Sequence, residues 1–154
     1  MLASGNTSCG YSPQQLRSMQ LDDDCIGQIL RAKEQEQQPS TNFAKSQPIS
    51  FRRLLQQWDQ LIIHDGVLYR LFHHHSKEQI SLQLIVPTVL REEIVKQMHE
   101  GVASGHLGQD KTLHHLKERF YWPGHYNDVR DWCQTCATCA SNTLFKVTTR
   151  FNIS

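Results

Sequence analysis

The sequence predicts an α+β protein in which a small antiparallel β-sheet extension precedes a zinc-stapled three-helix bundle, with a helical N-terminal segment before both. Three observations indicate this fold class: a hairpin signal within residues 61–72, helical apolar spacing after Pro87, and a cluster of histidines and cysteines in residues 99–139. A length of 154 residues allows one ordinary domain, or one small domain with extensions.

The N-terminal segment contains many helix formers but only a patchy apolar spacing. We expect one or two helices between Ser12 and Gln38, with Pro39 as a stop. Residues 39–49 are rich in Pro, Ser, Thr and Asn, which predicts a linker or loop. Residues 1–48 together are therefore expected to form a helical, partly disordered linker region.

Residues 49–87 are predicted to form the small β-hairpin extension. The segment opens with a short helix for which Ser50 is the expected N-cap. Asp65-Gly66 then separates two β-prone runs, the strongest short-range signal for a hairpin. Residues 80–87 alternate in polarity and end at Pro87, so about three antiparallel strands are expected.

Helical spacing after Pro87 predicts the first of three short helices. Thr88 is its candidate N-cap and His99 lies at its end. Its predicted apolar face comprises Leu90, Ile94, Val95 and Met98.

Two further helices follow the first. The second opens at Asp110, with a buried stripe of Leu113, Leu116 and Phe120. The third covers residues 125–133, with Val129 and Trp132 facing inward. Because these helices carry few large apolar side chains, the unit needs a staple to be stable.

The histidines and cysteines of this region have the spacing of a metal site. In one straight helix His99 and His106 would lie about 10 Å apart along the axis, so the chain must turn, and Gly101 and Gly105 suit that turn. Cys136 and Cys139 form a Cys-x-x-Cys pair whose sulfurs can meet one zinc ion. Redox chemistry is less favoured, because no strand and helix of the thioredoxin kind flank the pair.

Cys133 leaves an alternative open, because it makes a second Cys-x-x-Cys pair with Cys136. We favour Cys136 and Cys139 as ligands, since Cys133 is expected on the third helix beside Trp132. Four protein ligands would close the zinc coordination and leave no position for catalysis, so we expect one structural zinc.

The remaining histidines and cysteines are interpreted as ordinary side chains. Three successive histidines in an extended segment point to alternating faces and do not readily converge on one ion. We expect exposed, partly packed or unliganded side chains at His73, His74, His75, His114, His115, His125, Cys9 and Cys25.

The charge balance is nearly neutral. The chain has 16 Lys and Arg against 15 Asp and Glu, so composition gives no support for tight nonspecific nucleic-acid binding. The N-terminus lacks the pattern of a signal peptide, and no window approaches the roughly 18 apolar residues of a membrane span. We therefore expect an intracellular protein with no membrane partner.

Residues 99–139 closely resemble the His-His-Cys-Cys zinc-binding domain of integrases from gypsy-class long-terminal-repeat retrotransposons and of host proteins derived from them. The matching motifs are Gly-His-x-Gly-x-x-Lys-Thr from Gly105, Tyr-Trp-Pro-Gly from Tyr121, and the final Cys-x-x-Cys. The likeness covers about residues 50–142, and residues 12–40 more loosely. It implies a zinc domain of residues 88–142, a tail of residues 143–154, and the ligands His99, His106, Cys136 and Cys139, with Cys133 outside the ligand set.

The resemblance also indicates what the chain is not expected to do. An integrase needs a catalytic core with three carboxylates that hold divalent metal ions, whereas the fifteen residues after Cys139 contain no Asp or Glu. The acidic run of residues 22–24 is predicted to be a solvated or N-capping cluster. We therefore expect no enzyme, but a truncated or domesticated retroelement product, or a domain of a longer polyprotein.

Two functions are compatible with this interpretation. The first is a zinc-stabilised module for DNA binding and multimerisation, with weak to moderate, salt-sensitive phosphate contacts from Lys111, Lys117, Arg119 and Arg130. The second is a protein-interaction module with no nucleic-acid role, which docks onto a second copy or an integrase-like partner. The family chemistry favours a nuclear location, with the cytoplasm as the alternative; a chain of 17.9 kDa can enter the nucleus passively.

Overall fold

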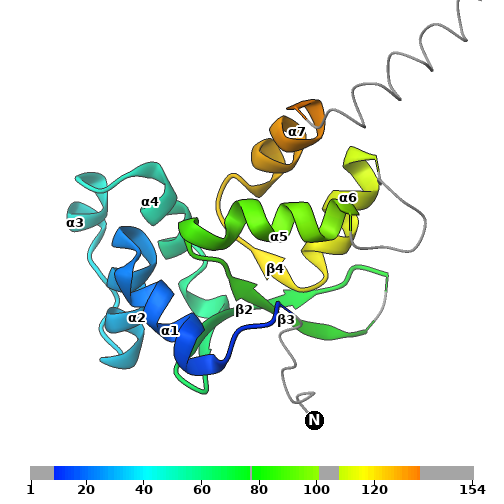
Figure 1. Ribbon diagram of the computed structural model, residues 1–154. Helices are drawn as coiled ribbons and strands as arrows, with labels where there is room; N and C mark the ends of the chain where they lie inside the picture. The colour runs from blue at the N-terminus through cyan, green and yellow to red at the C-terminus, as the bar shows by residue number, and fades with distance from the viewer. Residues whose placement is uncertain (1–8, 77, 101–107, 136–154) are drawn as a thin grey trace, which may run out of the picture. The chain divides into compact units, whose positions relative to one another are not determined.

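The computed structural model of the protein describes residues 9–76, 78–100 and 108–135 (Figure 1). Within these residues it contains seven α-helices and one four-stranded sheet, which confirms the predicted α+β class. The chain divides into two compact units, residues 1–91 with 117–123 and residues 92–116 with 124–154. None of the helices in the described ranges is long and apolar enough to cross a membrane.

The first unit begins with two helices, where the sequence predicted one or two. They are α1 (Pro13–Asp22) and α2 (Asp24–Glu34). Ser12 caps α1 through a capping box, in which its hydroxyl accepts from the Gln15 backbone while the Gln15 side chain accepts from the Ser12 backbone. Asp23 separates the helices, and its carboxylate caps α2 by accepting from the backbone of Cys25 and Ile26.

The segment predicted as a loop contains a short helix, α3 (Thr41–Lys45), and the expectation for residues 39–49 is wrong in that respect. The Ser40 hydroxyl accepts a hydrogen bond from the Phe43 backbone and so caps this helix. The Phe43 ring also packs edge-on against Phe51, with ring centroids 5.9 Å apart. A cap and a tertiary aromatic contact thus stabilise a turn of helix where composition favoured a loop.

The next helix, α4 (Ile49–Leu55), begins two residues earlier than expected. Ser50 lies within it and is not its N-cap; Pro48 occupies that position and makes no side-chain capping bond. The Pro48 carbonyl accepts from the Arg52 backbone at 3.2 Å, so the first helical hydrogen bond already starts there. The 3-10 turn η1 (Trp58–Gln60) leads into the sheet.

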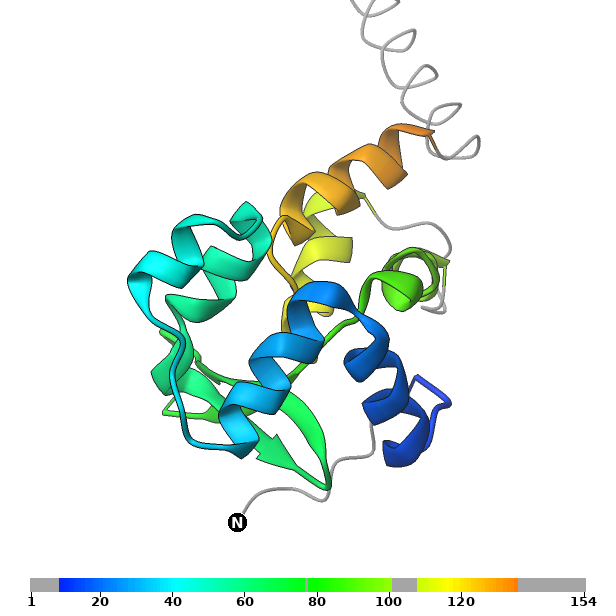
Figure 2. The same ribbon diagram turned by 90° about the vertical axis from the view of Figure 1, so that its left-hand side faces the viewer.

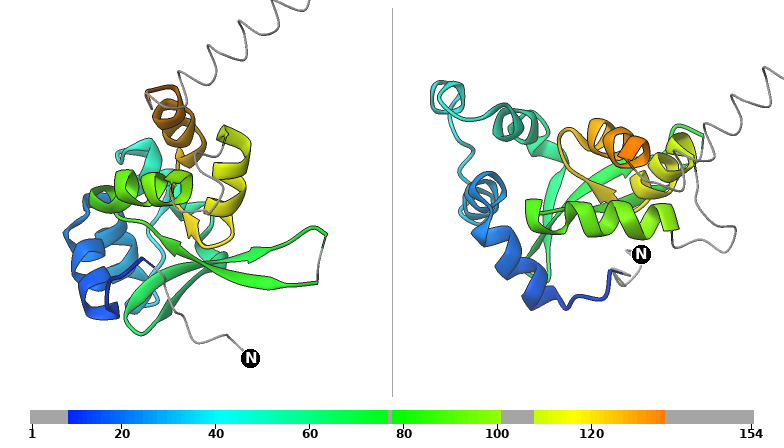
Figure 3. Two further views of the ribbon diagram at one scale, coloured as in Figure 1. Left: turned by 45° about the vertical axis from the view of Figure 1, so that its right-hand side comes forward. Right: turned by 45° about the horizontal axis from the view of Figure 1, so that its top comes forward.

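The sheet has the strand order β1-β2-β3-β4. Its strands are β1 (Leu61–His64), β2 (Val67–His73), β3 (Ile80–Ile85) and β4 (Phe120–Tyr121). The first three are antiparallel and were predicted, whereas β4 runs parallel to β3 and was not. The left view of Figure 3 shows the hairpin of β2 and β3 as a long twisted ribbon.

The turn between β1 and β2 is formed by the predicted Asp65-Gly66 pair. Both residues have positive φ, 52° and 78°, as expected for a turn whose twist matches that of the flanking strands. The Gly66 carbonyl accepts from the Arg17 guanidinium at 2.9 Å. The same guanidinium pairs with Glu34, which ties the turn to α1 and α2.

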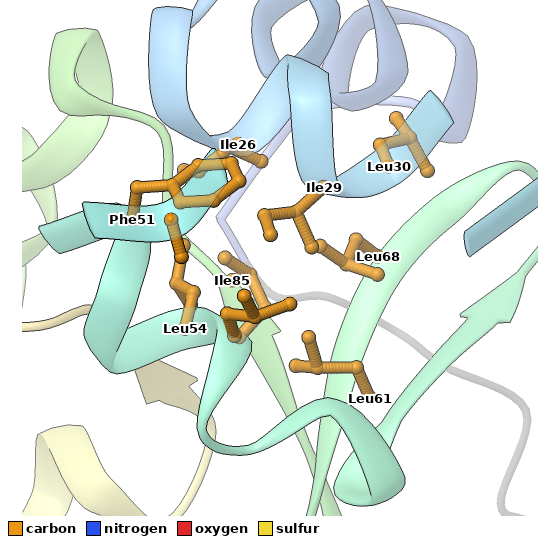
Figure 4. Packing of buried hydrophobic residues seen from close by; sticks show 10 residues of the cluster. Ile26, Ile29, Leu30, Phe51, Leu54, Leu61, Leu68 and Ile85 are labelled. Carbon is orange, nitrogen blue, oxygen red and sulfur yellow. The ribbon is translucent and has the colours of Figure 1, made fainter. Parts of the chain in front are cut away.

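Helices and sheet of the first unit share one hydrophobic core (Figure 4). The buried side chains come from helices α2, α3 and α4 and from strands β1, β2 and β3. They are Ile26, Ile29, Leu30, Ala44, Phe51, Leu54, Leu55, Leu61, Leu68 and Ile85. Figure 2 shows α3 and α4 side by side. The N-terminal helices therefore belong to the folded unit that contains the hairpin.

A buried glutamine joins α1 to the sheet. The last pair in the register of β2 and β3 is Tyr69 with Leu84, so Leu68 and Ile85 are the next residues along the two strands. The Gln20 amide lies there, donating to the carbonyls of Leu68 at 3.1 Å and Ile85 at 2.8 Å and accepting from the Leu68 backbone at 2.8 Å. The side chain thus supplies the hydrogen bonds that the end of the strand pair would otherwise lack.

Asp23 performs a second task at the start of α5 (Thr88–Glu100). Its other carboxylate oxygen accepts from the backbone and hydroxyl of Thr88, at 2.9 and 2.8 Å. Thr88 was expected to cap its own helix, but it is the first helical residue and its hydroxyl donates outward. Burial by itself raises the pKa of Asp23. The hydrogen bonds from Ile26 and Thr88 and the charge of Arg91 lower the pKa by more than burial raises it, so the pKa lies below its usual range.

The second unit contains the C-terminal part of α5, most of α6 (Gln109–Lys117) and α7 (His125–Thr135). These are the three helices predicted after Pro87. Helix α6 ends before Phe120, which the sequence had placed in its buried stripe and which belongs to β4 instead. The backbone of β3 decides this, because Leu84 N–H donates to the Arg119 carbonyl at 2.7 Å and Val86 N–H to the Tyr121 carbonyl at 3.0 Å.

Candidate metal centre

His99 is the predicted zinc ligand that lies within the described residues. It lies next to the last residue of α5 and its side chain is fully buried, with 0% exposure. It follows Val95 by four residues, so it continues the face on which Ile94 and Val95 are buried. Because imidazole is polar, such a buried ring must be held by hydrogen bonds or a metal ion.

The Nδ1 atom of His99 faces Thr112 on helix α6. Its distance to the Thr112 hydroxyl oxygen is 3.2 Å, and Thr112 is also fully buried. The Thr112 hydroxyl donates to the Gly108 carbonyl at 2.9 Å, four residues earlier. The same carbonyl accepts the Thr112 backbone N–H at 3.0 Å, so Thr112 is fixed at the start of α6.

Helix α7 brings Cys133 to the same imidazole. Its sulfur lies 3.8 Å from His99 Nδ1, and Cys133 itself is half-buried. Cys133 follows the fully buried Val129 by four residues, so both lie on one face of α7. Trp132, which was predicted to face inward, is half-buried like Cys133, and its indole nitrogen is shielded from solvent.

His99 fits a zinc site by its chemistry. An imidazole nitrogen is a donor that zinc prefers, and the ring of His99 is fully buried. Cys133, whose sulfur lies 3.8 Å from His99 Nδ1, is a neighbour of the ring outside the predicted ligand set. The other predicted ligands, His106, Cys136 and Cys139, lie outside the described residues. Within the described ranges, no three His, Cys, Asp or Glu side chains form a metal-binding group.

The other histidines are spread over both units. His114 is exposed and His115 half-buried on α6, with their ring centroids 6.0 Å apart, and His125 opens α7. His73 ends β2, and the His74 Nε2 atom lies 3.0 Å from the Ser81 hydroxyl across the hairpin. The tip of this hairpin lines an open hollow of about 440 Å³ that includes His75.

The upstream cysteines lie in the first unit. Cys9 is buried and Cys25 is half-buried. Burial is the main cause that raises the pKa of the Cys25 thiol above its usual range. Cys25 is therefore more strongly protonated than an exposed thiol, which disfavours it as a nucleophile.

The four basic residues predicted to contact DNA are all exposed. Lys111 and Arg130 belong to the second unit, and Lys117 and Arg119 to the first. The backbone at Lys117 and Arg119 is fixed, because their carbonyls accept hydrogen bonds from the Gln83 side chain and the Leu84 backbone. Arg130 lies 3.5 Å from the carboxylate of Asp131, an exposed pair that contributes little to stability.

Thr112 and Gly108 are the site residues that analysis of the sequence missed. Both belong to the Gly-His-x-Gly-x-x-Lys-Thr motif, but no role in the site was assigned to either. The signal was their spacing of four residues at the start of a helix, since a threonine hydroxyl can donate to the carbonyl four residues before it.

Comparison with known proteins agrees with this geometry. Residues 86–143 match the family model described as the integrase zinc binding domain. That domain binds Zn²⁺, so zinc is the metal cofactor of this part of the chain, as the sequence predicted. The matched segment includes all four predicted ligands. No solved structure matches the chain.

Proposed function

We propose that this chain acts in DNA binding and multimerisation as an integrase-like zinc module that originated in a gypsy-class retrotransposon. The observation that carries the proposal is the match of residues 86–143 to the integrase zinc binding domain, together with the buried His99 within that segment. The match concerns the zinc domain alone, and the proposed role requires no catalysis.

The zinc ion in this proposal is single and structural. His99, His106, Cys136 and Cys139 are the proposed ligands, with Cys133 outside the ligand set. When bound, zinc would supply a cross-link that staples α5, α6 and α7 into a three-helix bundle. The described part of this unit has few fully buried large side chains, which is why such a staple would contribute to stability.

The proposed DNA contacts are phosphate contacts from exposed cationic side chains. Lys111, Lys117, Arg119 and Arg130 carry them, and the net charge of +1 leaves little long-range attraction from the rest of the chain. If all four contact phosphates of duplex DNA, log K falls with log salt with a slope of roughly −3.6. Affinity should then drop about 10²-fold between 50 and 200 mM salt.

The test measures binding of the zinc-loaded full chain to a labelled DNA duplex by fluorescence anisotropy over a salt series. Lys111→Gln should weaken binding and reduce the salt slope by about 1. Lys96→Gln is the matched control, because Lys96 is also exposed but is not a proposed contact. Absence of binding to the wild type even at low salt would contradict the DNA role.

A second function is supported by the near-neutral charge and by exposed apolar side chains. Phe43 and Ile49, which flank the loop between α3 and α4, are 45% and 55% exposed. Such a surface suits contact with a second copy of the chain or an integrase-like partner rather than with phosphate. Sedimentation of the zinc-loaded chain as a monomer at every concentration would contradict self-association.

We further propose the nucleus as the site of action, with the cytoplasm as the alternative. The proposed organisation keeps residues 88–142 as the zinc domain and residues 49–87 as the hairpin extension that precedes it. Residues 1–48 and 143–154 complete the chain as an N-terminal helical region, whose α2 and α3 contribute to the core of the hairpin unit, and a tail.

A further inference from the structure

A histidine binds zinc through one of its two ring nitrogens. A neutral imidazole carries its proton on one nitrogen and a lone pair on the other, and only the lone pair binds a metal ion. The hydrogen-bond partner of the protonated nitrogen decides which form is present. For His99 that partner is visible, because Nδ1 lies 3.2 Å from the Thr112 hydroxyl oxygen.

The direction of this contact follows from counting hydrogens. A threonine hydroxyl has one hydrogen to donate, and that of Thr112 is directed to the Gly108 carbonyl at 2.9 Å. The carbonyl can only accept, so it cannot be the donor in this pair. The Thr112 oxygen therefore meets His99 Nδ1 through a lone pair, and the hydrogen between them belongs to Nδ1.

Cys133 agrees with this assignment. Its sulfur lies 3.8 Å from the same Nδ1 atom and can act as a weak second acceptor of the N–H. It therefore lies beside the protonated nitrogen, on the side of the ring that offers no lone pair to zinc.

We propose that Thr112 is a positioning residue for the zinc site: its hydroxyl oxygen holds the Nδ1–H of His99 and leaves Nε2 as the nitrogen that binds zinc. The inference rests on the zinc binding in the proposed function and is independent of the DNA role. Gly108 contributes by its carbonyl, which fixes the Thr112 backbone and hydroxyl together. Since His99 and Thr112 are both fully buried, solvent does not readily replace the hydroxyl if it is removed.

The affinity test compares two substitutions of Thr112. Thr112→Val has nearly the same shape but no hydroxyl, and should weaken zinc binding about 10- to 100-fold, as removal of such a partner does at other zinc sites. Thr112→Ser keeps the hydroxyl and should bind zinc as the wild type does. Zinc affinity is measured by competition with a chromophoric chelator, and circular dichroism checks that each variant is folded.

Thr88→Val is the matched control. It makes the same substitution in the helix that carries His99 and removes the hydroxyl bond to Asp23. It should lower stability while leaving zinc affinity unchanged. Equal loss of affinity in Thr88→Val and Thr112→Val would show a general effect of stability and overturn the positioning role.

The tautomer itself is read from ¹⁵N NMR of the zinc-loaded wild type, which decides the question even if Thr112→Val does not fold. A protonated Nδ1 and a metal-bound Nε2 at His99 are expected. Zinc on Nδ1, or full affinity in Thr112→Val, would overturn the inference alone. A wild type that binds no zinc would overturn the zinc site as well, whereas loss of DNA binding with zinc retained would concern only the DNA role.

Discussion

The Gln20 amide offers a sharp test of how the N-terminal helices are joined to the sheet. Gln20→Leu keeps the approximate volume of the side chain but removes its three hydrogen bonds to the backbone of Leu68 and Ile85. Gln20 is fully buried, so water does not readily replace them. The substitution leaves one backbone N–H and two carbonyls without these partners at the end of the strand pair.

The expected loss follows from those three groups. Each lost bond costs about 1 kcal/mol, and a buried donor left unsatisfied costs about 1–3 kcal/mol. The free energy of unfolding should therefore fall by about 3–5 kcal/mol, a large share of the roughly 5–15 kcal/mol that folded proteins possess. The extra apolar surface of leucine offsets only part of this loss.

The assay is equilibrium urea unfolding followed by circular dichroism, at one fixed zinc concentration for all variants. Gln28→Leu is the matched control, because the Gln28 amide donates to the Asp24 carbonyl on the exposed side of α2. It should change the free energy of unfolding by no more than about 0.5 kcal/mol. A Gln20→Leu protein as stable as this control would refute the view that the amide completes the strand pair.

Two further predictions concern the capping aspartate and the zinc ligands. Asp23→Ala should lower the free energy of unfolding by about 1–2 kcal/mol at neutral pH. Because the folded-state pKa of Asp23 is lowered, this deficit is complete above the unfolded pKa of about 3.9 and shrinks as the pH falls through the folded-state pKa. Urea titrations from pH 7 to pH 3 measure it, with Asp22→Ala as a neighbour that should cause no such deficit. Elemental analysis should find one zinc per chain in Cys133→Ser and none in Cys136→Ser; the reverse result would exchange their roles.

Local signals in the sequence were sufficient for the elements that local chemistry controls. Asp65-Gly66 predicted the hairpin because few other pairs adopt two positive φ angles easily, and both angles are positive. The apolar face of α5 followed from helical periodicity, and the buried Leu90, Ile94 and Val95 confirm it. The acidic run of residues 22–24 was interpreted as a solvated or N-capping cluster, and Asp23 caps α2.

Other elements depend on partners far away in the chain. The strand at Phe120–Tyr121 has only two residues, so its own pattern is too short to distinguish it from the end of a helix, and the backbone of β3 decides its conformation. In the sequence Gln20 is an ordinary polar residue of a helix. Its role depends on carbonyls of strands that lie 48 and 65 residues later in the chain and accept its amide hydrogens. Such contacts between residues far apart in the chain produce no periodic pattern in the sequence.

The properties of the candidate metal centre likewise fall into those that the sequence determined and those that depend on the tertiary structure. The sequence by itself determined which residue types and spacings suit zinc, because a Cys-x-x-Cys pair and two spaced histidines carry the donors that zinc prefers. The tertiary structure decided that His99 is buried and that Thr112 and Cys133, 13 and 34 residues later, face its Nδ1 atom. The reason is physical: the ligand type is a property of one side chain, whereas the proton on an imidazole is placed by the groups that the fold brings to it.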